Sequence, residues 1–137
     1  MTAPMIALVP VLLALSAASA PAAAPIEGYW KNPIGSAIIA IAPCGHAWCG
    51  KVAWASPRGR REASKSTANV VGTMVLTGVQ RAGGRWTGSL FIPDDDVHVR
   101  AWLDLVGNNQ LKLTGCAFAG LFCRSQLWTR AEELPVD

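Results

Sequence analysis

Residue types that carry catalysis are few in this chain, and their spacing does not suit it. The two histidines, His46 and His98, lie in or beside predicted loops or on a polar strand face, without metal-ligand spacing. No Gly-x-Ser-x-Gly sequence presents a nucleophilic serine. The sequence therefore predicts that the protein is not an enzyme and needs no cofactor or metal.

Two clusters still have metal-binding groups. The acidic turn of residues 94–96 contains three consecutive aspartates, but it lacks the spaced ligands of a dedicated calcium loop, so we expect a solvated turn. Cys44, His46 and Cys49 are a possible zinc set, although their spacing is not a standard finger pattern. Disulfide formation is the competing use of these cysteines.

The chain has four cysteines, and an even number in an exported chain indicates disulfide bonds. Three pairings are formally possible. Cys44 and Cys49 bracket a short loop between strand-like segments, and so do Cys116 and Cys123. Because a hairpin brings such residues within bonding distance, we expect the two local pairs, Cys44–Cys49 and Cys116–Cys123.

Six tryptophans are many for a chain of 137 residues. Large flat side chains line small-molecule pockets, although they also fill the interior of a narrow barrel. Trp54, Trp86 and Trp128 are the candidates for ligand contact. Together they favour a binding protein over a catalyst.

The last predicted strand contains further candidates. Arg124 and Gln126 share a face with Trp128. If Trp128 points inward, both polar side chains do too, and the acidic or carbonyl group of a ligand would supply their partner. If Leu127 points inward instead, Arg124 and Gln126 are ordinary surface residues.

The elements that must position these side chains are short strands. From residue 27 onward, segments of period 2 alternate with turns rich in Gly, Pro and Asn. The expected strands are residues 28–31, 36–42, 49–54, 73–80, 85–92, 97–106, 110–116 and 123–130. About eight strands of this kind predict an all-β fold, a small antiparallel up-and-down barrel of the lipocalin or calycin type, because closure removes exposed sheet edges.

Residues 57–68 form the longest expected loop, and it is basic. Arg58, Arg60, Arg61 and Lys65 have no aromatic residue among them, and the net charge of the whole chain is only +3. We therefore expect a solvated loop and no nucleic-acid binding.

The N-terminus has the pattern of an export signal. Residues 5–15 are almost uninterruptedly apolar, shorter than the ~20 residues that span a bilayer, and small residues follow to position 24. We expect cleavage between residues 18 and 24, after Ala18 or Ala22, since Pro21 hinders a cut after Ala20. Residues 1–24 are thus predicted to be a signal peptide with a short linker and residues 25–137 one domain. The protein would be periplasmic or secreted, without stable membrane insertion after cleavage; a retained anchor is the alternative.

Several short motifs occur together in order. They are Gly28-Tyr29-Trp30, Cys44-Gly45, Cys49-Gly50-Lys51-Val52, Gly115-Cys116 and the segment from Ser125 to Arg130. This set resembles the bacterial family called domain of unknown function 2147, over essentially the whole mature chain. The resemblance implies an exported, lipocalin-like β-barrel. Gly-x-Trp on the first strand and a basic residue near the end of the last strand are also similar to the general lipocalin signature.

Barrel closure adds a structural expectation. The first strand must pair with the last, which places Trp30 and Arg130 at the same end. We expect Trp30 to be buried and the guanidinium of Arg130 to stack on it as a plug.

Two functions remain open. The first is an exported protein that binds a small, largely apolar or amphiphilic ligand inside the barrel. The second is an envelope interaction or inhibitor protein with a filled barrel and active loops. The volume of the barrel interior distinguishes them.

Overall fold

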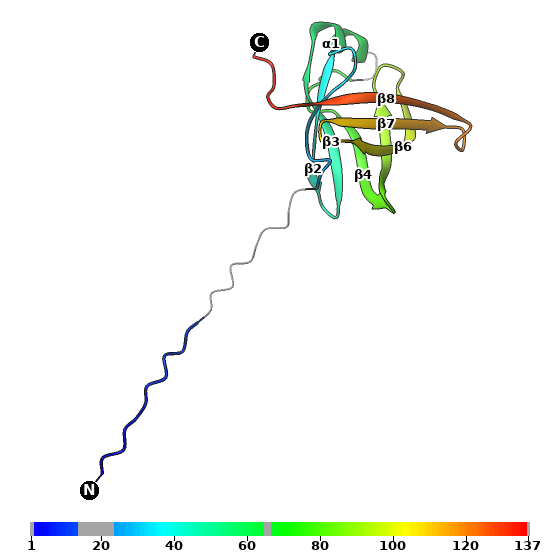
Figure 1. Cartoon of the computed structure of the whole chain (residues 1–137). Coiled ribbons are helices and arrows are strands. Elements are labelled where there is room, and N and C mark those ends of the chain that lie inside the picture. Colours follow the sequence, from blue (N-terminus) through cyan, green and yellow to red (C-terminus); the bar gives the residue numbers. More distant parts are fainter. Residues whose placement is uncertain (1, 14–23, 65–66, 137) are drawn as a thin grey trace.

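The computed structural model of the chain describes residues 2–13, 24–64 and 67–136. Its strands are β1 (Gly28–Lys31), β2 (Ala37–Cys44), β3 (Ala47–Ala55), β4 (Met74–Ala82), β5 (Arg85–Ile92), β6 (Val97–Val106), β7 (Gln110–Ala117) and β8 (Phe122–Ala131). They form one closed antiparallel barrel in sequence order, and β1 pairs with β8 (Figure 1). The predicted up-and-down barrel is confirmed.

The N-terminal segment lies apart from the barrel. Residues 2–13 form neither helix nor strand and run away from the body of the molecule (Figure 1). The predicted cleavage positions after Ala18 and Ala22 lie outside the described residues. Within the described ranges, no helix has the length and hydropathy needed to cross a bilayer.

One half of the barrel interior is filled with apolar side chains. Alternation along each strand turns every second side chain inward, as in the register pair Trp86 and Leu103 between β5 and β6. Ile26, from the segment before β1, and Trp30 are fully buried in this half. The rest of the filled half is lined by Ile41, Leu76, Val79, Ala101 and Leu111.

A plug closes the filled end of the barrel. The guanidinium of Arg130 lies 4.2 Å from the ring centroid of Trp30, and the Trp30 indole Nε1 donates to the carbonyl of Ile26 at 2.8 Å. Arg130 also donates to three main-chain carbonyls at 2.8–2.9 Å, those of Glu27, Pro25 and Asn108. The expected contact between Trp30 and Arg130 is therefore present. Gly28 makes room for it, because a Cβ there would lie 2.9 Å from Nη1 of Arg130.

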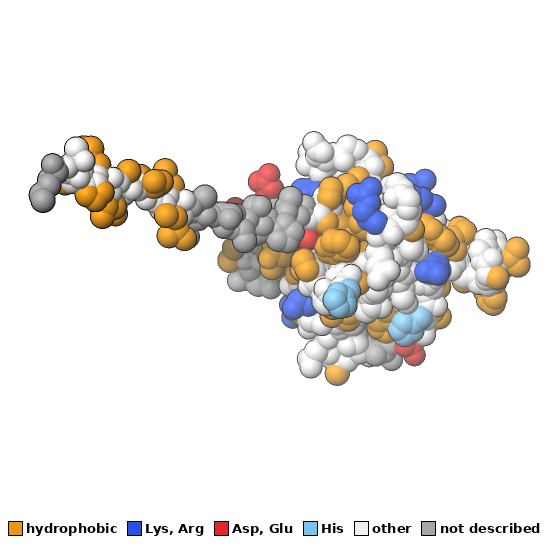
Figure 2. All heavy atoms as spheres, turned by 90° about the horizontal axis from the view of Figure 1, so that it is seen from below, with side chains coloured by type: hydrophobic (Ala, Val, Ile, Leu, Met, Phe, Trp, Pro, Cys, Tyr) orange, Lys and Arg blue, Asp and Glu red, His pale blue; other side chains and the backbone are white. Residues whose placement is uncertain are grey.

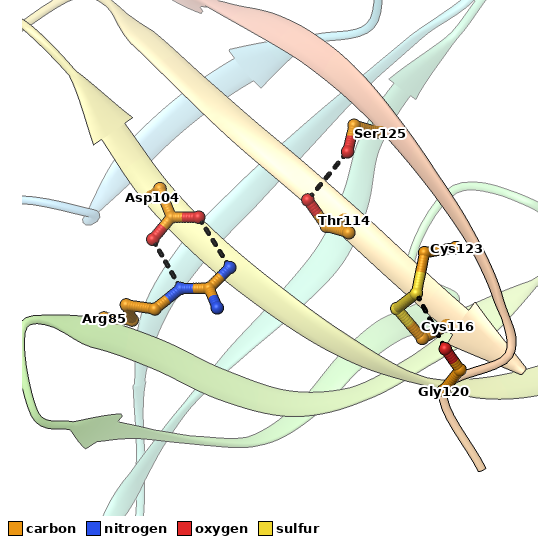
Figure 3. The surroundings of a disulfide bond; sticks show 7 residues. All are labelled: Arg85, Asp104, Thr114, Cys116, Gly120, Cys123 and Ser125. Atoms are coloured by element: carbon orange, nitrogen blue, oxygen red, sulfur yellow. Dashed lines mark hydrogen bonds and ion pairs between the residues drawn. A yellow bond between two sulfur atoms is a disulfide. The ribbon is translucent and has the colours of Figure 1, made fainter.

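The two disulfides close the hairpins in which they were predicted. Cys44 is bonded to Cys49 across β2 and β3, and Cys116 to Cys123 across β7 and β8 (Figure 3). Sulfur atoms in a disulfide are not thiolate ligands, so the zinc interpretation of Cys44, His46 and Cys49 is wrong.

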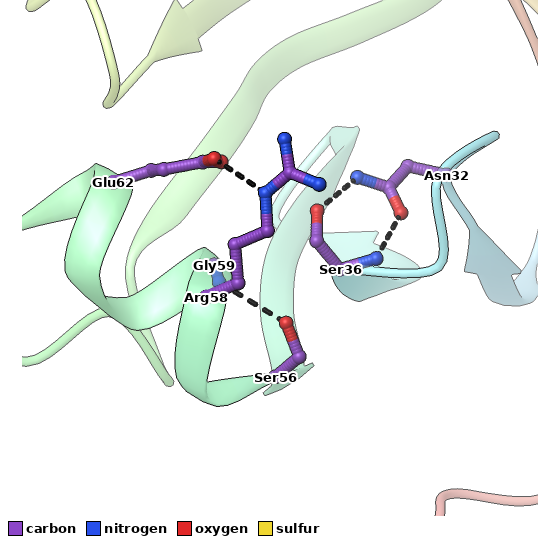
Figure 4. Close-up of polar contacts among 6 residues, drawn as sticks. All are labelled: Asn32, Ser36, Ser56, Arg58, Gly59 and Glu62. Carbon is purple, nitrogen blue, oxygen red and sulfur yellow. Dashed lines mark hydrogen bonds and ion pairs between the residues drawn. The ribbon is translucent and has the colours of Figure 1, made fainter.

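The segment expected to be one long loop begins with a short helix, α1 (Pro57–Ala63). Ser56 caps it, since its hydroxyl accepts a hydrogen bond from the amide of Gly59 at 3.1 Å, and Pro57 suits the first turn (Figure 4). Arg58 and Glu62 add an ion pair of 2.8 Å one turn apart. The loop prediction was wrong here because a helix of two turns is too short to show a hydrophobic period.

Candidate functional site

The other half of the barrel contains a cavity of about 490 Å³. It lies at the end opposite Trp30 and Arg130, among the ends of the strands that lead to α1 and to the β5–β6 and β7–β8 turns. Its walls are mainly apolar side chains of the inward faces, including Ile39, Val52, Leu90, Val99 and Leu113. A volume of this size is in the range of small-molecule pockets.

Strand β8 supplies the polar part of the cavity wall. Trp128 is only 9 % exposed whereas Leu127 is 43 % exposed, so the face of Trp128 points inward. Arg124, Gln126 and Trp128 all line the cavity. Of the two orientations that the sequence allowed for this strand, the structure contains the one in which Arg124 and Gln126 share the cavity side of β8 with Trp128, although both remain exposed.

Along β8 these three residues run from the inner part of the cavity at Trp128 to its mouth at Arg124. The Trp128 indole Nε1 donates to the Gln126 side-chain oxygen at 3.1 Å, which satisfies the buried end of the row. Gln126 and Arg124 are both exposed, and Arg124 lies nearer the mouth. Within the described part of the chain, its guanidinium makes no ion pair or hydrogen bond. It is therefore free to bind an anionic or carbonyl group at the cavity entrance.

Trp54 and Trp86 were also predicted to bind a ligand, but neither lines the cavity. Trp54 is turned away by a β-bulge. Ile39 pairs with Val52 and Ile38 pairs with Trp54, so Ala53 is an extra residue in β3. This bulge reverses the inward alternation, and Ala55 lines the cavity in place of Trp54.

Trp86 points inward but belongs to the filled half. It is 5 % exposed, is packed with the core cluster and lies under the Arg81 guanidinium at 4.7 Å. The prediction of a binding role for Trp86 therefore has no support from its position. The number of tryptophans does not indicate which of them lie in the filled half of the barrel and which lie at the cavity. The position of each residue along its strand decides this.

Helix α1 and the β1–β2 loop form one side of the rim (Figure 4). Asn32 organises this loop, because its side-chain oxygen accepts hydrogen bonds from the amides of Ser36 and Ala37 at 2.8 and 3.1 Å. Gly59 of α1 lies so close to the loop that a Cβ would be 2.5 Å from the carbonyl oxygen of Ser36. Ala63 and Glu62 of the same helix line the cavity, and sequence reasoning missed both.

Carboxylates are present at the rim but do not form a metal site. Asp94 and Asp95 line the cavity mouth from the β5–β6 turn. Among residues 2–13, 24–64 and 67–136, no cluster of three or more His, Cys, Asp or Glu side chains is placed to hold a metal ion.

An ion pair between Arg85 and Asp104 lies on the outer surface of the barrel. Arg85 donates to both oxygens of Asp104 at 2.8 and 2.9 Å (Figure 3). These hydrogen bonds hold the pKa of the Asp104 carboxyl below its ordinary value of 3.8. The pair is not part of the cavity wall.

A closed eight-stranded barrel with a Trp–Arg plug at one end and an apolar cavity at the other is a lipocalin-like barrel. The chain belongs to the family DUF2147, described as an uncharacterized protein conserved in bacteria, whose model matches residues 28–130. Protein HP1028 from the human pathogen Helicobacter pylori, which belongs to the lipocalin family, has a similar structure with a TM-score of 0.59 at 12 % identity. The match covers 78 % of this chain and 83 % of HP1028. No curated protein matches the chain.

Proposed function

We propose that this protein is exported and binds a small, largely apolar ligand in the barrel cavity, with an acidic or carbonyl head group at Arg124. The observation that carries the proposal is the cavity of about 490 Å³, whose walls are mainly apolar, with the polar row of β8 on one side and carboxylates at the rim. An apolar ligand gains free energy when it leaves water for such walls, at roughly 25 cal/mol per Å² of buried apolar surface. The hydrogen-bonding row on β8 then fixes which end of the ligand faces the mouth.

The side chains of this row suit binding better than chemistry. The Gln126 amide and the Trp128 indole supply neither a nucleophile nor a general base. Arg124 binds anions and cannot accept a proton. We therefore propose a binding protein and not an enzyme.

Export to an oxidising compartment is the second part of the proposal. Its support is the apolar N-terminal segment followed by small residues, together with two disulfides that lie in hairpins at opposite ends of the barrel. Fractionation of cells that produce the full-length chain, with the intact mass of the product, tests this part. A protein of undiminished mass in the cytoplasm would contradict it.

Native mass spectrometry tests the ligand directly. Protein purified gently from its own periplasm is expected to have a co-purifying mass that disappears when the barrel is unfolded. A titration with fatty acids and related amphiphiles is expected to change the tryptophan fluorescence, because Trp128 lies in the cavity wall. A broad amphiphile screen without a spectral or thermal shift would favour the alternative, an interaction or inhibitor protein that uses its loops.

The head-group assignment predicts the effect of Arg124→Gln. Loss of the charge should weaken binding of an anionic amphiphile by about 1 kcal/mol, or five- to tenfold in Kd, because the side chain is partly screened by water. Binding of an uncharged analogue should be nearly unchanged. Arg100→Gln is the matched control, since Arg100 is an exposed arginine on the outer face of β6 near the same end. Equal losses for both ligands, or for both variants, would contradict the assignment.

A further inference from the structure

The hairpin between β7 and β8 carries large apolar side chains that are exposed. Phe118, Leu121 and Phe122 are 74 %, 80 % and 68 % exposed. The hairpin projects from the body of the barrel, and hydrophobic side chains gather at its end (Figures 1 and 2). Exposed apolar patches on soluble proteins mark contact surfaces.

The backbone of this tip also departs from what folding alone favours. Phe118 and Ala119 have φ values of 52° and 55°, in the left-handed region that suits Gly or Asn. A phenylalanine at position 118 is thus unfavourable both for the turn and for an exposed surface. Departures from local rules of this kind occur at functional sites, where a second requirement decides the residue.

Exposed apolar residues are concentrated at the cavity end as a whole. Nine large hydrophobic side chains are exposed among the described residues from 24 to 131. Seven of them lie in the connections at the cavity end or on the first residue of the strand that follows. They are Ile34, Val71, Met74, Val97, Phe118, Leu121 and Phe122. The asymmetry points to a partner that meets the mouth of the cavity.

We infer that the β7–β8 tip is a peripheral membrane-docking element that brings the cavity mouth against a lipid surface. The inference rests on the proposed function for its purpose, the exchange of an amphiphile between bilayer and barrel. Phe122 and Ala117 line both the tip and the cavity, so an apolar chain entering there stays in contact with apolar side chains. Docking of this kind is reversible, because three side chains are far fewer than a membrane-spanning segment contains.

Charge along the hairpin fits a bilayer better than a protein partner. Arg124 is the only charged residue between Leu113 and Thr129. Arg124 follows Leu121 by three residues, which is roughly 7–10 Å along a strand. Peripheral segments enter the membrane interface to a similar depth, about 5–10 Å. With the tip inserted, its guanidinium lies at the level of the phosphate groups.

The projecting tip by itself is too small for a stable protein interface. Three side chains on a projecting turn bury less than the ~800 Å² per partner that a specific complex needs. The acidic residues 94–96 lie in the β5–β6 turn, apart from the projecting tip of the β7–β8 hairpin (Figure 1).

Vesicle flotation tests the inference. The protein used is the processed form, and its intact mass shows that the N-terminal segment has been removed. The wild type is expected to float with vesicles of phosphatidylethanolamine and phosphatidylglycerol. Phe118→Asn combined with Leu121→Ser is expected to weaken this binding at least about tenfold, since both side chains lose their apolar transfer. Its melting temperature should be close to that of the wild type, because neither side chain is buried and the loss of the Phe118–Phe122 ring contact is offset by an Asn that tolerates the left-handed region.

Val106→Asn is the matched control, because Val106 is an exposed apolar residue at the closed end and 46 % exposed. It should bind vesicles as the wild type does. The double variant should still take up an amphiphile from solution, which separates a failure of docking from a failure of the proposed function. Absence of vesicle binding by the wild type, or equal binding by the double variant, would overturn the inference. Dimers that form with the wild-type tip and vanish in the variant would assign the tip to a second copy instead.

Discussion

Arg130 joins the first strand, the last strand and the segment before the barrel, so its removal measures how much the plug stabilises the fold. In Arg130→Ala the ring of Trp30 stays in the core but loses the cation that lies 4.2 Å from its centroid and covers that face. The carbonyl of Glu27 loses a donor at 2.8 Å in a part-buried position. The carbonyls of Pro25 and Asn108 are bonded in exposed contacts, so water replaces the guanidinium there.

The magnitude follows from these contacts. A desolvated cation–π contact contributes about 1–2 kcal/mol, and a charge-assisted hydrogen bond in a part-buried site contributes about 1 kcal/mol more. We therefore expect Arg130→Ala to lower the free energy of unfolding by about 2–3 kcal/mol. For a domain of this size that corresponds to a fall in Tm of roughly 8–12 °C.

Thermal unfolding followed by circular dichroism is the assay. Arg100→Ala removes the same side chain from the outer face of β6 and should change stability by less than about 0.5 kcal/mol. Arg130→Lys keeps the charge but loses the planar fork, so its Tm should lie between those of the wild type and Arg130→Ala. Ligand affinity should be unchanged, since Arg130 does not line the cavity. A Tm for Arg130→Ala within about 2 °C of the wild type would refute this view of the plug.

Two further substitutions test the rim and the outer surface. Gly59→Ala places a Cβ 2.5 Å from the main-chain oxygen of Ser36, so urea unfolding should show a loss of about 1–3 kcal/mol, whereas Gly84→Ala has open space and should be near neutral; equal effects would contradict the close approach. The Asp104 carboxyl has its pKa lowered by Arg85, so its contribution to stability is complete above about pH 4 and is lost as the pH falls through its depressed pKa. Asp104→Asn should therefore be less stable than the wild type at neutral pH and approach it in acid; a stability difference that is the same at both pH values would rule this out.

Strand alternation and local cysteine spacing were enough to predict most of the fold. The expected strand limits agree with the observed ones to within two residues at each end. The reason is that period-2 patterns and Gly-rich turns act locally, and a hairpin alone brings Cys116 opposite Cys123. On β8 the same alternation left two possible orientations, with either Trp128 or Leu127 pointing inward. The packing of the whole barrel, which buries Trp128, decides between them.

The remaining errors have physical causes that a single strand does not reveal. Trp54 was a candidate for ligand contact because of its large flat side chain, but the bulge at Ala53 turns it away from the cavity. Bulges arise from the fit of two strands, so the sequence of one strand contains no mark of them. Helix α1 did leave a signal, the Ser56-Pro57 start and the Arg58–Glu62 spacing, but its single buried residue, Ala63, is too little for a hydrophobic period.

The position of the second disulfide explains how an apolar tip keeps its form without a core beneath it. In the filled half of the barrel, packing around Trp30 and Leu103 holds the strands. At the β7–β8 tip, Phe118 and Leu121 are exposed, and the ring of Phe118 packs edge-to-face on that of Phe122 rather than into the barrel. The link between Cys116 and Cys123 stabilises the hairpin by about 2 kcal/mol through the unfolded chain, and that contribution does not depend on burial. The tip therefore keeps an unfavourable turn and a fixed direction at the mouth of the cavity, which is what docking to a surface requires.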